Sequence, residues 1–363
     1  MRLGIVGGGQ LARMLALAAA SLGVRCRVLE PAADACAAVA AEHIRAPYDD
    51  AAGLRRLADD ADCVSFEFEN VPVASLDYLV DHAPVFPSPK ALATARDRLI
   101  EKTLFRTLGI PTAEFRAVDS RADLDAAVAA LGLPAVLKTR TLGYDGKGQA
   151  VLRDAADLAA AWAKLGGVPL ILEAFVPFAR EVSVIAVRGR DGESAFYPLT
   201  ENTHREGILH LSFSCANDEM QAPAQDYANR LLDALDYVGV LALELFEADG
   251  KLLANEFAPR VHNSGHWTIE GAETSQFENH VRAVLGLPLG RTNALGCSAM
   301  VNFIGRLPPR EAVLRLPAVH LHDYAKQPRA GRKVGHATLR VTDAASLHAA
   351  LPGLLALAES DVL

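Results

Sequence analysis

The sequence predicts a mixed α/β and α+β protein, with a Rossmann-like parallel sheet at its N-terminal end and a small β-rich domain at its C-terminal end. Short apolar strand patterns alternate with helical patterns over the first ninety residues, which is typical of parallel βαβ units. Patterns of antiparallel strands follow between residues 181 and 257, and short strands with turn signals follow residue 298. A chain of 363 residues is too long for one ordinary core. We therefore expect domains at 1–94, 95–293 and 294–363, the second including a smaller unit at 112–178.

Composition excludes several classes of partner. The net charge of −8 argues against broad binding to the phosphate backbone of nucleic acid, although it allows local basic pockets for small anions. The N-terminus enters a strand directly, without a signal peptide, and no apolar run has the roughly 18–20 residues that a membrane span requires. The five scattered cysteines are typical of reduced, buried thiols. We expect a cytoplasmic protein that binds neither nucleic acid nor membrane.

The first motif, Gly7–Ala12, fits the pattern G-x-G-x-x-G/A between a strand and a helix. Glu30 closes the next strand about 20 residues later, as in the dinucleotide-binding template, so an NAD-dependent oxidoreductase is one interpretation. The backbone N–H groups and the helix dipole require only an anion, however, and a phosphate-bearing substrate satisfies them equally. A tight turn with a purely structural role is the third interpretation.

The second motif is a glycine-rich loop that follows Lys138, the end of an apolar strand. Its glycines allow the backbone to close over phosphates and to open again, and Lys138 could reach phosphate oxygens as a point charge. The spacing differs from that of a P-loop, and the alternative is a surface hairpin with a glycine-rich tip. The loop consists of Gly143, Tyr144, Asp145, Gly146, Lys147, Gly148 and Gln149.

The third motif is a pair of glutamates, Glu244 and Glu256, on the two strands of an expected hairpin. Two carboxylates facing a nucleotide site would suit Mg²⁺, which prefers hard oxygen ligands and keeps waters and phosphates in its shell. A two-residue loop at Asp249 and Gly250 would place the glutamates on opposite faces. A three-residue loop beginning at Ala248 would pair residue 244 with residue 254 and place both glutamates on one face. We predict the three-residue loop.

Two further segments carry positive charge. Arg260, directly after the second strand of the hairpin, would balance phosphate or bicarbonate. His262 and His266 have an i, i+4 spacing that could hold zinc, but Gly265 between them argues against the helix that this would need. Near the C-terminus, a basic string is either solvated or aimed at an anion, and its last two residues, Arg332 and Lys333, follow a bend expected at Gly331. The string consists of Lys326, Arg329, Arg332 and Lys333.

Over nearly its whole length the chain resembles the N5-carboxyaminoimidazole ribonucleotide synthetases, a family of ATP-grasp enzymes of purine biosynthesis. The segments that carry the resemblance are Gly7–Leu11, Phe66–Val71, Asp97-Arg98, Gly143–Gln149, Arg180–Ser183, Tyr197–Asn202, Asn255–His266, Ser275–Glu278 and Gly331–His336. The resemblance implies an ATP-grasp fold in which residues 112–178 form the lid. It also implies a homodimer and a reaction in which ATP phosphorylates bicarbonate. The resulting carboxyphosphate would supply CO₂ to the amine of 5-aminoimidazole ribonucleotide.

The resemblance also implies roles for individual residues. The expected ATP contacts are Arg98, Lys138, the loop Gly143–Gln149, Glu173, Ala174, Phe175, Val176, Glu181, His204, Asn255 and Glu256. Glu244 and Glu256 would hold Mg²⁺. The ribonucleotide would meet Gln10, Leu11, Glu67, Tyr144, Lys326 and Arg332. The expected catalytic residues are Asp145 and Lys147, together with Arg260 and His262 for the bicarbonate step.

Two positions depart from the family pattern: Ala12 stands where glycine is common, and Ala174 stands where a second acidic residue is common. Three alternatives to the implied function remain open at this point. They are the NAD-dependent oxidoreductase, a non-catalytic nucleotide-binding module, and an ATP-grasp ligase that uses formate or an amino acid in place of bicarbonate.

Overall fold

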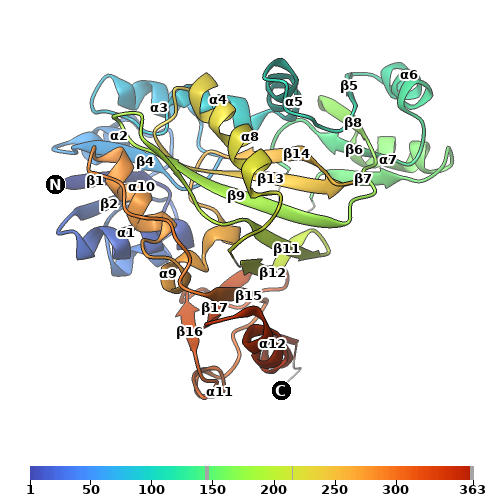
Figure 1. The fold of residues 1–363 in the computed structure, drawn as a ribbon. Helices are drawn as coiled ribbons and strands as arrows, with labels where there is room; N and C mark the ends of the chain where they lie inside the picture. The colour runs from blue at the N-terminus through green and yellow to red at the C-terminus, as the bar shows by residue number, and fades with distance from the viewer. Residues whose placement is uncertain (144–146, 215, 360–363) are drawn as a thin grey trace.

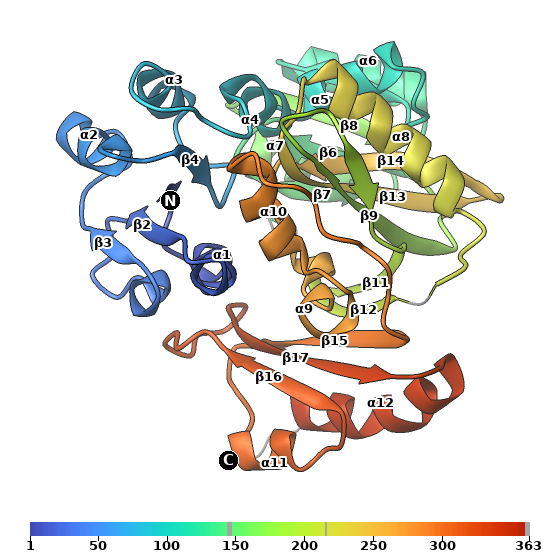
Figure 2. The same ribbon diagram turned by 60° about the vertical axis from the view of Figure 1, so that its left-hand side comes forward.

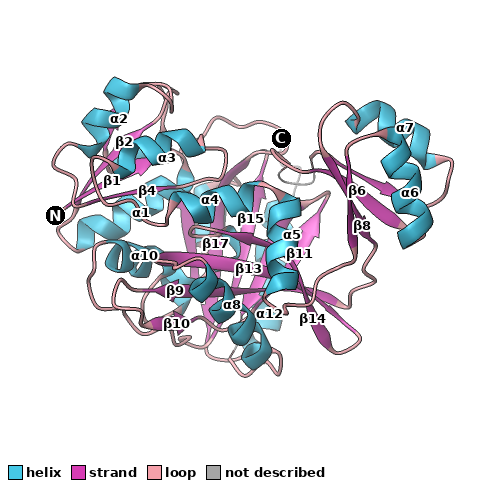
Figure 3. Ribbon diagram, turned by 90° about the horizontal axis from the view of Figure 1, so that it is seen from above, coloured by secondary structure: helices cyan, strands magenta, loops and turns pink. Residues whose placement is uncertain are grey.

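A computed structural model describes residues 1–143, 147–214 and 216–359, and these form three β-sheets with flanking helices (Figure 1). A four-stranded sheet from the N-terminal end and a second four-stranded sheet lie at opposite ends of the molecule, as the view from above shows (Figure 3). A nine-stranded sheet lies between them, and its last strands carry the C-terminal helices below the main body (Figure 2). The three layers surround the region in which most of the expected site residues lie.

The N-terminal sheet is parallel throughout, with the strand order β3-β2-β1-β4. Strands β1 and β4 are buried along almost their whole length because helices cover both faces, as expected for a Rossmann-like unit, whereas β2 and β3 carry exposed charged residues. The strands are β1 (Arg2–Val6), β2 (Arg25–Leu29), β3 (Glu42–Ile44) and β4 (Cys63–Phe66). The connecting helices are α1 (Gln10–Ser21), the 3₁₀ turn η1 (Cys36–Val39), α2 (Ala51–Ala58) and α3 (Val73–Val80). This part of the fold agrees with the sequence prediction.

Two helices, α4 (Pro89–Arg96) and α5 (Arg98–Thr107), lead from this sheet to the next. The chain breaks between them at Asp97, which is extended and caps α5 by accepting hydrogen bonds from Leu99 N at 2.8 Å and Ile100 N at 3.3 Å. The same carboxylate receives the guanidinium of Arg140 from the next sheet, with N···O distances of 2.6 and 3.1 Å. Asp97 therefore fixes the start of α5 and the position of the residue that follows strand β6.

The second four-stranded sheet has the order β5-β8-β6-β7 and is antiparallel. Helices α6 (Arg121–Leu131) and α7 (Asp157–Leu165) pack on it around their own apolar cluster. The strands are β5 (Phe115–Val118), β6 (Ala135–Thr139), β7 (Gln149–Leu152) and β8 (Leu170–Ala174). Strands β6 and β7 form the hairpin whose connection is the glycine-rich loop.

The nine-stranded sheet has the order β14-β13-β9-β11-β12-β15-β17-β16, with β10 on the side of β9. Its strands are β9 (Arg180–Arg188), β10 (Ser194–Phe196), β11 (Thr200–Arg205), β12 (Ile208–Ser214), β13 (Gly239–Ala248), β14 (Lys251–Ala258), β15 (Cys297–Ile304), β16 (Val319–Asp323) and β17 (Lys333–Val341). The strands of the expected C-terminal domain therefore continue the central sheet through the pairing of β12 with β15.

The remaining helices cover the faces of this large sheet. Helix α10 packs against α1, so one apolar cluster joins the N-terminal unit to strands β9 and β13. These helices are α8 (Gln221–Ala234), the 3₁₀ turn η2 (Asn263–Gly265), α9 (Thr268–Gly271), α10 (Gln276–Val284), α11 (Arg310–Leu314) and α12 (Ala344–Glu359). No helix within the described ranges has both the length and the apolar character of a bilayer span.

The cysteines differ partly from expectation. Cys26, Cys36 and Cys63 are free and buried, and burial raises the pKa of Cys26 and Cys63 to about 12. Cys297, however, is disulfide-bonded, so the prediction of a reduced thiol is wrong at this position. Cys215 lies outside the described residues.

Replacing Asp97 by alanine should destabilise the protein, because the change removes both a helix cap and the acceptor of a paired guanidinium. We expect Asp97→Ala to lower the free energy of unfolding by about 1–3 kcal/mol. The matched control is Asp125→Ala, which removes an exposed i, i+4 partner of Arg121 and should cost less than about 0.5 kcal/mol. Urea denaturation followed by circular dichroism measures both, and equal costs for the two variants would contradict the assigned role of Asp97.

Candidate functional site

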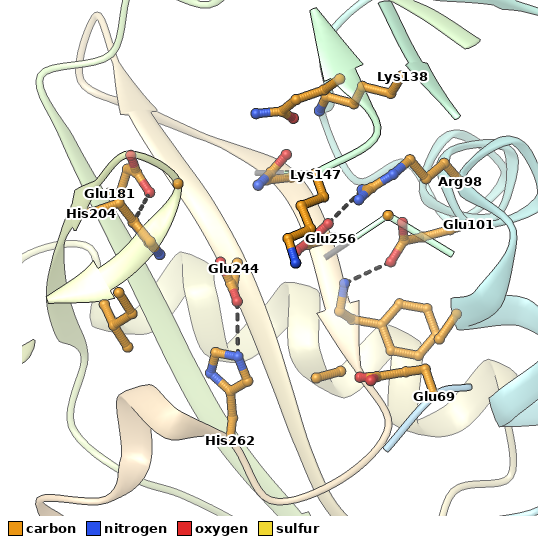
Figure 4. Close-up of a pocket in the computed structure, with 18 of the residues that line it drawn as sticks. Glu69, Arg98, Glu101, Lys138, Lys147, Glu181, His204, Glu244, Glu256 and His262 are labelled. Atoms are coloured by element: carbon orange, nitrogen blue, oxygen red, sulfur yellow. Dashed lines mark hydrogen bonds and ion pairs between the residues drawn. The ribbon is translucent and has the colours of Figure 1, made fainter. Parts of the chain in front are cut away.

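A cavity of about 680 Å³ opens where the three sheets meet. It is lined by the start of α1, the segment after β4, helix α5, the small sheet and the strands β9, β13 and β14. Carboxylates and cationic side chains alternate around its wall, as the close-up shows (Figure 4). A volume of this size is typical of small-molecule sites.

The hairpin of β13 and β14 places Glu244 opposite Glu256. The connection has only two residues, Asp249 and Gly250, both with positive φ, so the prediction of a three-residue loop is wrong. The register nevertheless shifts by one residue between Glu244 and Leu245, which leaves Asn255 as the extra residue of a β-bulge. The bulge reverses the effect of the short loop, and both glutamates lie on the same face as direct cross-strand neighbours.

Each of these two glutamates is paired with a cationic or basic side chain (Figure 4). Glu256 is paired with Arg98 at the start of α5 at 2.5 Å, and Glu244 lies 3.1 Å from Nε2 of His262. Burial alone would raise the pKa of Glu244, but the nearby charges of His262, His204 and Arg260 outweigh it and hold the pKa well below its usual value. Glu244 is therefore a carboxylate at neutral pH, despite lying in an apolar strand.

A second charged group lies deeper, beside the β8 strand end. Glu173 is buried, and its Oε2 receives Lys138 at 3.0 Å and Lys102 at 3.3 Å. Burial alone would raise the pKa of Glu173, but the two ammonium groups outweigh it and lower the pKa to about 2. The other oxygen, Oε1, is buried and has no partner among the described residues. An acceptor in this state suits a hydrogen-bond donor supplied by a ligand.

On the other side of the cavity, His204 of β11 lies beside Glu181 of β9, with Nδ1 2.7 Å from Oε2. Burial alone would lower the pKa of His204, but Glu181 and Glu244 outweigh it and raise the pKa. Arg260, after the end of β14, contacts Glu69, with Nη2 2.7 Å from Oε1. His262 is held through its ring Nδ1 by Ser264 at 2.9 Å.

The glycine turn before α1 binds carboxylates of the protein itself. Glu67 accepts hydrogen bonds from Gly9 N and, at 2.8 Å, from Ala12 N, and a Cβ atom at Gly9 would lie 2.7 Å from its Oε1. Glu30 accepts from Gly8 N at 3.1 Å and from Tyr48 at 2.6 Å. Three N–H groups of this turn, those of Gly8, Gly9 and Ala12, are therefore already engaged by carboxylates of the protein, which argues against a pyrophosphate bound there as in the dinucleotide template.

Residues from the two ends of the chain meet beside this turn. Lys326 donates a hydrogen bond to the side chain of Gln10, although 316 residues separate them in sequence. Burial lowers the pKa of Lys326, as do the charges of Arg332 and Lys333, whereas Cys36 and Glu67 oppose this shift. The expected ribonucleotide residues at the N-terminal and C-terminal ends are thus close together.

The glycine-rich loop is described at its ends only. Gly148 has a φ of +72°, and a Cβ atom there would lie 2.6 Å from Oγ1 of Thr139, so the position requires glycine. Gly143 lies beside Arg98, and Lys147 lines the cavity. Tyr144, Asp145 and Gly146 lie outside the described residues.

Three family models together match most of the chain. The ribonucleotide synthetase preATP-grasp domain matches residues 1–96, and the ATP-grasp domain matches residues 103–277. The phosphoribosylaminoimidazole carboxylase C-terminal domain matches residues 298–350. The N5-carboxyaminoimidazole ribonucleotide synthase of Pseudomonas aeruginosa is 60% identical over 360 residues, which cover 99% of this chain and 100% of that protein.

The chain belongs to the N5-carboxyaminoimidazole ribonucleotide synthase family. The crystal structure of the synthetase from Thermus thermophilus is similar, with 52% identity, a TM-score of 0.94 and 99% of each chain covered. The Aspergillus clavatus synthase in complex with ADP and 5-aminoimidazole ribonucleotide has 31% identity and a TM-score of 0.90, covering 98% of this chain and 97% of that one. The predicted ATP-grasp fold and the predicted class of ATP-dependent ligase are confirmed.

Most residues that the family resemblance singled out line the one cavity. These are Gln10, Leu11, Glu67, Arg98, Lys138, Gly143, Lys147, Gln149, Glu173, Ala174, Phe175, Val176, Glu181, His204, Glu244, Asn255, Glu256, Arg260 and His262. Gly148, Lys326 and Arg332 are described but do not contribute to its lining. No group of three or more His, Cys, Asp or Glu side chains placed to hold a metal ion occurs in the described part of the chain.

Sequence reasoning missed three charged residues of the site. Lys102 is buried beneath Glu173, and Glu101 is buried while accepting from Phe257 N at 2.7 Å. Glu69 lines the cavity beside Arg260. The available signal was in α5, because Glu101 and Phe105 are one helical turn apart and both belong to its buried face. Charged residues in a helix are usually interpreted as solvent-exposed, so the helical pattern did not indicate that Glu101 and Lys102 are buried.

Removing the charge of Glu173 should strongly destabilise the protein, since two ammonium groups would lose their shared partner. We expect Glu173→Gln to lower the free energy of unfolding by roughly 3 kcal/mol at pH 7, and the double variant Lys102→Met/Glu173→Gln to recover part of that loss. Because the folded-state pKa of Glu173 is lowered to about 2, its contribution is present above the unfolded value of 4.5 and is lost as the pH falls towards 2.

Denaturation with urea at several pH values measures these effects. The stability of Glu173→Gln should vary less than that of the wild type as the pH falls below 4.5. A double variant that is less stable than the single variant would show that Lys102 and Glu173 do not act as a pair.

Proposed function

We propose that the chain carboxylates 5-aminoimidazole ribonucleotide with ATP and bicarbonate. The γ-phosphoryl group of ATP passes to an oxygen of bicarbonate, which gives ADP and carboxyphosphate. Carboxyphosphate then breaks at its bridging C–O bond into CO₂ and inorganic phosphate. The exocyclic amine of the ribonucleotide attacks the carbon of CO₂ and loses a proton, and N5-carboxyaminoimidazole ribonucleotide results.

The observation that carries the proposal is the pair of facing carboxylates, Glu244 and Glu256, among cationic side chains at the meeting point of three sheets. Phosphoryl transfer needs mainly positioning and compensation of charge on the phosphate oxygens. Arg98, Lys138 and Arg260 supply fixed positive charge around the same cavity. A carboxylate partner anchors each of the three.

The same carboxylates fit Mg²⁺. Glu244 and Glu256 offer hard oxygen ligands from adjacent strands, and the buried Oδ1 of Asn255, the bulged residue next to Glu256, has no partner among the described residues. When bound, the ion would neutralise charge on the phosphate groups. Glu244 and Glu256 would hold it.

The nucleotide would occupy the side of the cavity formed by the small sheet. Glu173, Ala174, Phe175 and Val176 line this side as one continuous segment. The unpartnered Oε1 of Glu173 supports a contact with a donor of the base, and Glu181 and His204 would face the ribose. Lys138 and the loop from Gly143 to Gln149 would contact the phosphates.

The ribonucleotide would lie between the N-terminal sheet and the C-terminal strands. The contact of Gln10 with Lys326 and the nearby charge of Arg332 support a site for its phosphate. A relative of known structure binds ADP and 5-aminoimidazole ribonucleotide together, which supports two adjacent sites in this chain as well. Leu11, Glu67 and Tyr144 remain proposed contacts, and Asp145 remains the proposed acceptor of the amine proton.

Arg260 and His262 would bind bicarbonate and carboxyphosphate between these two sites. Both line the cavity, and both are largely shielded from solvent. Shielding matters because water would hydrolyse carboxyphosphate before the amine captures CO₂. Closure of the loop at 143–149 would complete the shielding and couple nucleotide binding to carboxylation.

Three further expectations remain predictions. These are the domain boundaries at 1–94, 95–293 with a lid at 112–178, and 294–363, the homodimer, and the cytoplasmic location. Gel filtration with light scattering tests the dimer directly.

A phosphate-release assay with several acids tests the proposed reaction. In buffer stripped of CO₂, with ATP, Mg²⁺ and the ribonucleotide, we expect bicarbonate to support turnover at least roughly 100-fold better than formate or glycine. Release with formate or glycine at the rate of bicarbonate would identify a different carboxylate substrate. Binding of ATP without release under any of these conditions would identify a non-catalytic module.

Lys147 should matter more for turnover than for nucleotide affinity, since we place it at the ribonucleotide as well as over the phosphates. We expect Lys147→Ala to lower kcat by about 10- to 100-fold while the Kd of ADP changes by less than about threefold. Lys164→Ala, which alters an exposed residue of α7, is the control. Steady-state kinetics and calorimetric titration measure the two quantities, and equal losses in both would argue against a role at the ribonucleotide.

A further inference from the structure

Glu69 lines the cavity, yet no step of the proposed reaction uses it. It belongs to the segment between β4 and α3, at the edge of the N-terminal sheet. In the close-up of the cavity, Glu69 lies below Glu256 (Figure 4). A partly buried carboxylate in such a place needs a partner, and its partner identifies its role.

That partner is Arg260. Both carboxylate oxygens of Glu69 approach the same nitrogen, Nη2, at 2.7 and 3.0 Å. A second nitrogen of Arg260, Nη1, donates to the carbonyl of Val261 at 3.0 Å, and Nε is buried without a partner in the described residues. The guanidinium is thus held from one side, while part of its donor set remains for an anion.

A second carboxylate, Glu244 of β13, lines the same cavity. Glu244 is paired with His262, whereas Arg260 is paired with Glu69. Each of the two basic side chains proposed for the bicarbonate step therefore has a carboxylate partner of its own.

The backbone around Glu69 is itself anchored at alternate residues. Glu67 accepts from Ala12 N at 2.8 Å, and the carbonyl of Val71 accepts from Arg96 at 3.0 Å. Val71 is also fully buried in the core of the N-terminal unit. The position of Glu69 is therefore set by the N-terminal sheet, while Arg260 follows strand β14 of the central sheet.

We propose that Glu69 is a positioning residue for bicarbonate: it fixes Arg260 in the orientation that receives the anion. The inference rests on the proposed function, because it assumes that Arg260 binds bicarbonate. It also ties the bicarbonate position to the segment that carries Glu67, on the ribonucleotide side. Glu69 itself touches no reacting atom.

The test compares Glu69→Gln and Glu69→Ala with a matched control. Glutamine keeps the shape and one acceptor oxygen, while alanine removes both. The control is Glu278→Gln in α10, where a carboxylate and Arg282 form a pair of similar exposure, 26% and 27% against 27% and 16% for Glu69 and Arg260. The measurements are the KM for bicarbonate, the KM for ATP, and the thermal midpoint of unfolding.

We expect the KM for bicarbonate to rise about tenfold in Glu69→Gln and further in Glu69→Ala, with the KM for ATP within about twofold of the wild type. The control should leave both constants unchanged. In an Arg260→Lys background, Glu69→Gln should raise the KM for bicarbonate by less than about threefold, because the two residues act as one unit.

Two results would overturn the inference. An unchanged KM for bicarbonate, with a loss of thermal stability like that of the control, would leave Glu69 a purely structural partner. A lower KM for bicarbonate would show that Glu69 competes with the anion for Arg260. Failure of the proposed function is distinguishable from both, because the wild-type protein would then release no phosphate in response to bicarbonate.

Discussion

One extra residue in strand β14, the bulged Asn255, places the side chain of Glu256 on the face of the sheet that lines the cavity. Without the bulge at Asn255, the two-residue loop would turn Glu256 to the far face of the sheet, away from Glu244. Arg98 would lose its carboxylate partner, and the start of α5 would have no charged contact with β14. The bulge also changes the direction of the Asn255 side chain, since the side chain of a bulged residue does not follow the strict alternation between the two faces of a sheet. Its side chain lines the cavity with that of Glu256.

The second constraint is that the cationic side chains of the cavity are held in place before an anionic ligand arrives. Long flexible side chains lose conformational entropy when they bind, and a carboxylate that already fixes each one lowers this cost. The structure repeats this arrangement around the cavity wall. The pairs are Glu256 with Arg98, Glu173 with Lys138 and Lys102, Asp97 with Arg140, and Glu69 with Arg260. The abundance of carboxylates in a site for anions is explained by this anchoring.

Much of this arrangement could be predicted from the sequence, because the relevant signals are local. Alternating strand and helix patterns identified the parallel sheet, and glycine spacing identified the loop after Lys138. The features that were missed depend on residues far apart in the chain. Nothing near Gly9 indicates that Glu67, 58 residues later, occupies the helix N-terminus, and hairpin rules predict loop length but not an irregularity further along the strand. The partners of Lys102 and Glu69 are likewise visible only once the sheets are assembled.

The division of the strands among sheets has a mechanical consequence. Strands β12 and β15 share a continuous ladder, so the C-terminal strands cannot rotate against the rest of the central sheet without breaking a row of backbone hydrogen bonds. The small sheet shares no ladder with the central sheet among the described residues, and an isolated bridge joins Thr112, just before β5, to Ala254 of β14. Two side-chain pairs, Arg140 with Asp97 and Glu173 with Lys102, hold it against α5 and the cap of that helix. A displacement of the small sheet would therefore break one bridge and these pairs, but no row of strand hydrogen bonds.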